Sequence, residues 1–260
     1  MTTASTVARV LVLLVAAVLC ASAAPAWTPA AQVALGEEAA SIAPSDLARQ
    51  IARHSEEFRR GLLRPFEAAS GGAHTKNPGG SGDLDRSIVT AVGRAVQGIR
   101  DHESFAEVVF RLGVVAHFVA DANNPLNTSD HDPAESRYFT DYLHYVDSAR
   151  PRYPILFYAE GRDLRDERDL ERLVGHTLER GRRLYPLIGR EYARIGKIDG
   201  RALFDDRSTA FGIGSIASSH AVSDIAAVLR YIWLAAGGGD HRELRLTRPP
   251  STADPVLLSR

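Results

Sequence analysis

The chain has 260 residues, 45% of them hydrophobic and 24% charged, which is a globular composition and excludes a disordered or collagen-like chain. This length allows one large domain or two small ones. The formal net charge is −1, so no bulk positive field points to nucleic acid or an anionic membrane, and a single cysteine excludes a disulfide framework.

The first 26 residues are predicted to be a signal peptide. Arg9 precedes an apolar run over residues 10–19, which is shorter than the roughly 20 residues that a membrane span requires. Small residues follow, and an Ala-Pro-Ala triplet at positions 24–26 fits a cleavage site before Trp27. The only cysteine, Cys20, would leave with this peptide. We therefore expect an exported protein, periplasmic or secreted, with no transmembrane segment in the mature chain.

The rest of the chain has helical patterns and no convincing alternating strand pattern. One all-α domain, a multi-helix bundle, is therefore predicted over residues 27–236, with a flexible tail over 237–260. The glycine-rich stretch 64–82 is predicted to be a loop, and Pro186 is predicted to kink or split its helix. Helices are expected over residues 29–40, 46–62, 84–99, 103–122, 134–147, 167–195 and 208–235.

One helix in the middle of the chain carries the candidate chemistry. From Val108 to Ala122 the sequence is apolar on nearly every side, which is typical of a buried helix. His117 and Asp121 are polar exceptions in this run. They are four residues apart, so they lie on one face of the helix. A buried ionisable group without a partner costs several kcal/mol. A neutral imidazole and a carboxylate on one face suit zinc or a similar divalent ion. A His–Asp hydrogen bond without metal fits the same spacing.

The stretch VAHFVADANNPLN, residues 115–127, resembles the central helix of the zinc-dependent phospholipase C family, which shares its fold with the S1/P1 nucleases. Those proteins are exported, all-helical and hold three zinc ions, and their motif reads His-x3-Asp followed by a proline and a histidine. Their mature chain starts with a tryptophan that binds metal, and a histidine-bearing glycine loop precedes the central helix. Over residues 27–236 the resemblance implies four metal ligands, Trp27, His74, His117 and Asp121.

Several ligand positions of the family are replaced in this chain. Gln32 stands where the family has a histidine, and Phe66 stands where it has a carboxylate. The final histidine of the central motif is Asn127, and a later His-x3-Glu pair is replaced by Phe139 and Leu143. We therefore expect one or two zinc ions instead of three. We also expect the side chains of Asn127, Phe139 and Leu143 to converge beside Asp121.

Neighbouring residues offer an alternative in which the lost site is rebuilt. Asp141 and His144 lie three residues apart on the same predicted helix and could both face inward with His131 from the preceding loop. Against this, Arg137 stands four residues before Asp141, where the two would form an ordinary surface ion pair.

Two further patterns receive structural interpretations. His220 and Asp224 repeat the His-x3-Asp spacing on the last helix, where a structural hydrogen bond is the favoured interpretation. The arginines between residues 162 and 194 alternate with acidic residues, which is typical of a solvated helix face.

The resemblance implies an exported zinc-dependent, phospholipase C-like enzyme that hydrolyses the phosphodiester bonds of a phospholipid-type substrate. Glu67 is the nearby candidate for the catalytic carboxylate that acts as general base. The near-neutral net charge disfavours a nucleic-acid substrate. The alternative is a catalytically degenerate relative, a binding or structural protein with at most one metal ion. The number of metal ligands that the chain retains distinguishes the two.

Overall fold

Helices make up the regular structure of this chain. The computed structural model describes residues 27–69, 71–129, 135–159, 162–196 and 199–239. Within these ranges there is no β-strand, which confirms the prediction of an all-α fold. The predicted signal peptide and residues 240–260 of the predicted tail lie outside the described residues. The helices are α2 (Pro29–Ser41), α3 (Ser45–Arg53), α4 (Ser55–Ala68), α5 (Leu84–Arg100), α6 (Phe105–Asn123), α7 (Glu135–Ala149), α8 (Glu167–Ile195) and α9 (Thr209–Ala235), with short 3-10 turns between several of them.

Several helices begin at a side chain that accepts a hydrogen bond from an otherwise unpaired backbone N–H group. Thr28 caps α2, which also has proline at its first position. Ser104, Asp166 and Ser208 cap α6, α8 and α9 in the same way. At its other end, α8 stops at Gly196, whose φ of 63° lies in the left-handed region that glycine adopts without strain. Local sequence therefore fixes several of these helix boundaries.

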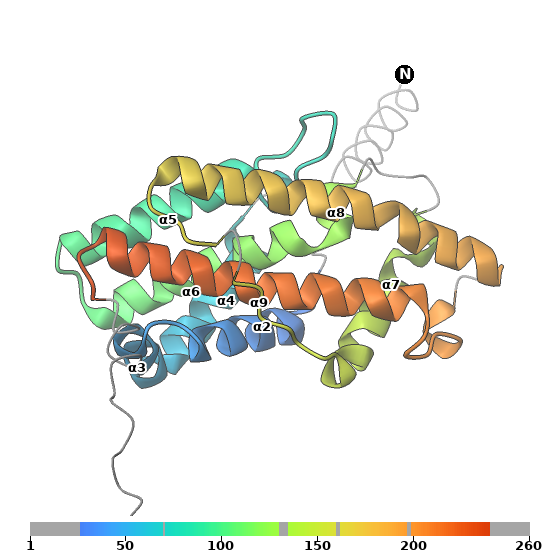
Figure 1. Ribbon diagram of the computed structural model, residues 1–260, viewed down its shortest axis with the longest axis horizontal. Coiled ribbons are helices and arrows are strands. Elements are labelled where there is room, and N and C mark those ends of the chain that lie inside the picture. Colours follow the sequence, from blue (N-terminus) through green and yellow to red (C-terminus); the bar gives the residue numbers. More distant parts are fainter. Residues whose placement is uncertain (1–26, 70, 130–134, 160–161, 197–198, 240–260) are drawn as a thin grey trace, which may run out of the picture.

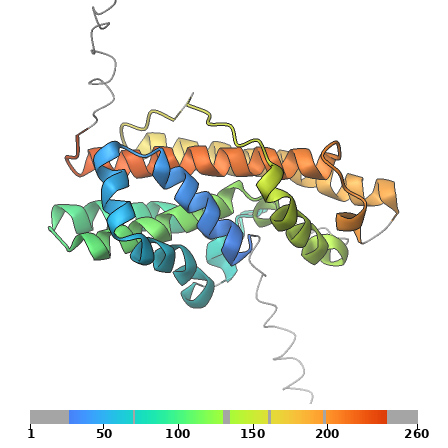
Figure 2. The same cartoon turned by 90° about the horizontal axis from the view of Figure 1, so that it is seen from below.

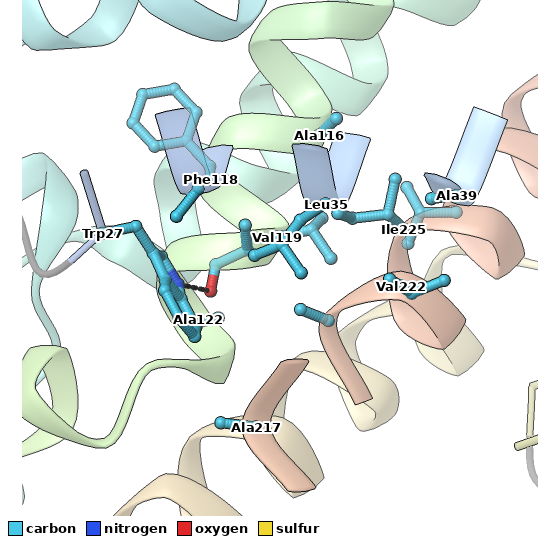
Figure 3. Packing of buried hydrophobic residues seen from close by; sticks show 14 of the residues in the cluster. Trp27, Leu35, Ala39, Ala116, Phe118, Val119, Ala122, Ala217, Val222 and Ile225 are labelled. Carbon is cyan, nitrogen blue, oxygen red and sulfur yellow. Dashed lines mark hydrogen bonds between the residues drawn. The ribbon is translucent and has the colours of Figure 1, made fainter. Parts of the chain in front are cut away.

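The central helix of the bundle is α6. It contacts α4, α5, α8 and α9, while α2 packs on both α6 and α9. The two longest helices, α8 and α9, lie side by side along the length of the molecule (Figures 1 and 2). Leu35 of α2, Val119 of α6 and Ile225 of α9 meet in the hydrophobic core (Figure 3). The apolar character of α6 on nearly all sides thus follows from its position between other helices.

Two glycines let α4 and α6 approach closely. A Cβ atom at Gly61 would lie 2.9 Å from the Cα of Gly113, and one at Gly113 would lie 2.8 Å from the backbone nitrogen of Leu62 and overlap the carbonyl oxygen of Phe58. Any larger residue at either position would push the two backbones apart. This contact brings the last turns of α4, with their free carbonyl groups, against the face of α6 that carries His117.

The helix boundaries differ from the predicted ones in three places. The helix expected over 46–62 is divided at His54, and α4 then continues through Pro65 to Ala68, so the predicted loop begins several residues later. The predicted split at Pro186 is wrong, because α8 is continuous over 29 residues. Burial of one face of α8 along its whole length offsets the hydrogen bond that the proline cannot make.

The last helix is long and apolar enough to meet the composition criteria for a membrane span, with a mean hydropathy of 1.2 in its best window. The same window is 78% buried inside the fold. Its apolar character is therefore that of a core helix that packs against α2, α6 and α8.

Candidate metal centre

Three ionisable side chains meet between α4, α6 and the turn after α4. His117 and Asp121 lie one turn apart on α6, and His74 comes from the 3-10 turn Gly71–His74. Asp121 Oδ2 lies 2.7 Å from His74 Nδ1 and 3.1 Å from His117 Nε2, and the two nitrogens are 3.2 Å apart. Asp121 is 1% exposed, His74 is 6% exposed and His117 is fully buried. Within the described ranges, this is the only group of three or more His, Cys, Asp or Glu residues arranged to hold a metal ion.

Backbone carbonyl groups of α4 orient both imidazole rings. His117 Nδ1 lies 2.7 Å from the carbonyl oxygen of Leu62, and His74 Nε2 lies 3.3 Å from that of Pro65. A carbonyl oxygen can only accept, so these ring nitrogens carry the hydrogens. In the neutral rings the other nitrogen of each histidine then presents a lone pair toward Asp121 Oδ2. Three electron-rich atoms converge on one point, and only a proton or a metal cation can stabilise such an arrangement.

In the metal-free protein, protons supply the positive charge. Burial by itself would lower the pKa of His74, but the hydrogen bond and charge of Asp121 outweigh it and raise that pKa above its usual value of 6.5. Burial would likewise raise the pKa of Asp121, but the two histidines outweigh it and lower that pKa below 3.8. Asp121 is therefore ionised and buried, and it needs a cationic partner.

Two amide side chains hold Asp121 from other directions. Gln32 Nε2 donates a hydrogen bond of 2.8 Å to Asp121 Oδ1. Asn127 Nδ2 donates one of 3.1 Å to the backbone oxygen of Asp121. Gln32 is fully buried, and its Oε1 atom has no hydrogen-bond partner within the described part of the chain. A buried acceptor without a donor is rare in native proteins, so this atom points to a missing donor beside the centre.

Aromatic rings form the walls of the centre. The Phe66 ring meets the His117 ring edge to face with centroids 4.7 Å apart, and the Phe118 ring lies 5.5 Å from the same histidine. Phe118 also packs 5.7 Å from the ring of His74. Apolar walls lower the local dielectric constant and strengthen the attraction between a carboxylate and a cation.

The donor set fits a divalent metal ion such as zinc. Two imidazole nitrogens and one carboxylate oxygen are zinc ligands, and catalytic zinc sites use three protein ligands with a fourth position open to water. The carbonyl contacts of both histidines are those that orient metal-ligating imidazoles in proteins. The residues present therefore fit a single ion.

The other predicted site residues lie around this group to different extents. Trp27 is 1% exposed, and its indole Nε1 donates a 2.8 Å hydrogen bond to the carbonyl oxygen of Ala120, next to Asp121 in the chain (Figure 3). The side chain of Glu67 is 73% exposed and pairs with Arg64 at 3.2 Å. The structure thus brings Trp27 close to the centre, whereas Glu67 points to solvent.

The replaced ligand positions have two different outcomes. Asn127 is buried beside Asp121, as expected, although it bonds the backbone and not the carboxylate. Phe139 and Leu143 pack half-buried against the hydrophobic core, and their convergence with Asn127 remains a prediction.

The rebuilt site is not formed as proposed. His144 is exposed. Asp141 accepts a 2.6 Å hydrogen bond from the Tyr192 hydroxyl and another from the backbone of Arg201. These contacts turn it toward α8, and the interpretation with Asp141 and His144 as ligands is wrong. His131 lies outside the described residues.

A second buried polar cluster surrounds Asp224, which is 0% exposed. Arg162 donates to Asp224 Oδ1 at 2.7 Å and also to His220 Nδ1 at 2.8 Å. Arg180 and Thr177 donate to Asp224 Oδ2 at 2.8 and 2.9 Å. Burial and the nearby Arg180 lower the pKa of His220 to about 4, so its ring is neutral.

This cluster corrects two expectations. The link between His220 and Asp224 runs through Arg162, where a direct hydrogen bond was expected. Arg162 and Arg180 are also not part of a solvated face, since their side chains are only 9% and 24% exposed. A buried aspartate one turn from a histidine was the available sequence clue, but it did not indicate which arginines would reach it.

Comparison with known proteins adds one structural similarity. No known protein family and no curated protein matches the chain. The fold is similar to the crystal structure of Clostridium perfringens alpha-toxin from avian strain SWCP, with a TM-score of 0.59 and 11% sequence identity. The match covers 82% of this chain and 65% of the other, so this chain spans less than two thirds of the alpha-toxin length. At this identity the similarity shows a shared fold only.

Proposed function

We propose that this protein is an exported, zinc-dependent phosphodiesterase of the phospholipase C type, with one metal ion held by His74, His117 and Asp121. The observation that carries the proposal is the convergence of three buried donor atoms, which all lie within 4.8 Å of one another. The resemblance of residues 115–127 to the zinc-dependent phospholipase C family and the similarity in fold to alpha-toxin support it. Export rests on the apolar N-terminal segment alone.

The chain's own residues prepare the centre in three ways. Leu62 and Pro65 fix which nitrogen of each histidine faces the ion. Asp121 supplies the negative charge. Phe66 and Phe118 keep the surroundings apolar, so that the charge of the ion acts on the substrate with little screening. A zinc ion supplies Lewis acidity toward a phosphoryl oxygen and lowers the pKa of bound water.

The substrate proposed is a phospholipid or another small phosphodiester and not nucleic acid. The net charge of −1 offers no bulk attraction for a polyanion. Among the three ligands, His74 is the most accessible, at 6% exposed, so the phosphodiester would approach from the side of the 3-10 turn. Trp27 is retained in the proposal as a further ligand through its terminal amine, which exists only after cleavage before this residue; the full chain offers the three side-chain ligands alone.

A second candidate function is a non-catalytic relative that binds one ion for stability. The observation that favours it is the position of Glu67, because this carboxylate faces solvent and, among the described residues, leaves the centre without a second acidic group. In that role the buried ion would stabilise the fold, because the free energy of metal binding adds to that of folding.

One experiment separates the two candidates. The full chain is purified, its zinc content is measured, and hydrolysis of bis(p-nitrophenyl) phosphate and of phosphatidylcholine vesicles is followed with and without chelator. The proposal predicts one bound zinc ion and hydrolysis that chelator abolishes and added zinc restores. One zinc ion without hydrolysis of either substrate would favour the structural role. Absence of bound zinc would refute both candidates.

A further inference from the structure

The two oxygens of Asp121 have different partners. Oδ2 faces both histidines, at 2.7 and 3.1 Å, and is the oxygen available to an ion between them. Oδ1 accepts the amide hydrogen of Gln32 at 2.8 Å. A carboxylate that bridges two metal ions commonly uses one oxygen for each. Here the second oxygen is already bonded to a neutral amide.

The orientation of the Gln32 amide follows from its neighbours. Its nitrogen lies beside two acceptors, Asp121 Oδ1 and, at 3.5 Å, the carbonyl oxygen of His117. Turning the amide over would place its oxygen against both acceptors, which is electrostatically unfavourable. The nitrogen therefore faces Asp121, and Oε1 remains a buried acceptor aimed elsewhere.

Within the described part of the chain, the surroundings also offer no negative charge for a second cation. Asp121 is the only carboxylate in the group, and the ring of Phe66 packs 4.7 Å from His117. One divalent ion and one carboxylate leave a net charge of about +1, whereas two ions would leave about +3 in a buried, apolar site. Asn127, the other polar neighbour, is a neutral amide that bonds the backbone of Asp121.

We propose that Gln32 is a positioning residue that holds Asp121 Oδ1, so that the carboxylate binds one divalent ion through Oδ2 alone, while the single negative charge of Asp121 excludes a second ion. The inference rests on the proposed metal site and adds its stoichiometry and the cause of it. Gln32 acts through Asp121 and does not itself bind the metal.

The test uses cobalt(II) in the full chain, since its visible absorption is intense in four-coordinate sites and weaker at higher coordination numbers. Wild-type protein should bind one equivalent with the intense spectrum. Gln32→Met keeps the side-chain length and removes the amide, which frees Oδ1. We expect one equivalent with a weaker spectrum, because Asp121 now binds through both oxygens.

Gln97→Met is the matched control. Gln97 makes the same kind of bond, from its amide to Asp101 Oδ1 at 2.7 Å, on the exposed end of α5. Its replacement should change neither the stoichiometry nor the spectrum.

A second variant tests the stoichiometry. Gln32→Glu keeps the shape but places a second carboxylate against Asp121, which favours a cation between the two. We expect it to bind two equivalents. If this variant does not fold, the stoichiometry of the wild type and the spectrum of Gln32→Met still test the inference. Two tightly bound ions in the wild type, or an unchanged spectrum in Gln32→Met, would overturn the inference while leaving the metal site intact. Absence of cobalt binding would overturn the inference together with the proposed function.

Discussion

Replacement of Gly113 by alanine should damage the fold and the metal centre together. The added Cβ atom would lie 2.8 Å from the Leu62 nitrogen and overlap the carbonyl oxygen of Phe58. Both neighbours are backbone atoms, so α4 and α6 must separate. Overpacking of this kind costs about 3 kcal/mol. The better helix propensity of alanine offsets about 1 kcal/mol. We expect a net loss of about 2 kcal/mol, which lowers the melting temperature by about 4–8 °C.

The same separation moves the Leu62 carbonyl group away from His117 Nδ1, to which it is now 2.7 Å distant. Loss of such an orienting contact lowers metal affinity by about tenfold or more. Gly93→Ala is the control, because Gly93 lies on the exposed face of α5 with nothing within 4 Å of the added atom. It should raise stability by about 0.5–1 kcal/mol and leave zinc affinity unchanged. Thermal unfolding and zinc competition titrations measure both effects. A Gly113→Ala protein as stable as the wild type, with the same zinc affinity, would refute the reasoning.

Glu67→Gln should change stability by less than about 0.5 kcal/mol and leave zinc content and hydrolysis intact, whereas loss of hydrolysis with zinc retained would reinstate Glu67 as general base. Asp224→Asn should lower the free energy of unfolding by about 3 kcal/mol in urea titrations, because it leaves two largely buried arginines without their carboxylate. In chelator-treated protein, the raised pKa of His74 gives a stabilisation that is full below pH 6.5 and is lost as the pH rises through that raised pKa. The lowered pKa of Asp121 gives a second stabilisation, which is fully present above pH 3.8 and is lost as the pH falls through the lowered pKa. The melting temperature of the metal-free protein should therefore fall as the pH rises above 6.5. The extra stability from zinc should grow over the same range, since zinc displaces protons from its ligands. The opposite trend with zinc would contradict the assignment of these side chains as ligands.

The fold class and the central helix could be predicted because they depend on local patterns. The run from Val108 to Ala122 is apolar on nearly all sides, and only a helix enclosed by others accommodates it. His117 and Asp121 could be paired from their spacing alone. His74 lies 47 residues from Asp121 in the chain, so only the resemblance to a known family connected them.

Contacts between distant elements account for what the sequence did not predict. Gln32 reaches Asp121 across 89 residues, and no local pattern shows that a glutamine in an alanine-rich helix caps a buried carboxylate. Arg162 and Arg180 follow a charge alternation that is typical of a surface. The packing of α8 on α9 nevertheless turns Arg180 to Asp224, and Arg162 reaches the same carboxylate from the segment before α8. Glu67 was placed by counting along the chain, and the continuation of α4 through Pro65 turned it to solvent.

The central claim, that His74, His117 and Asp121 hold one divalent ion, is tested most directly by the zinc X-ray absorption spectrum of the purified full chain. The account predicts about one zinc ion per chain, surrounded by nitrogen and oxygen atoms at about 2.0–2.2 Å, with outer-shell scattering from two imidazole rings. Zinc bound without imidazole scattering, or zinc absent at saturating concentration, would contradict it.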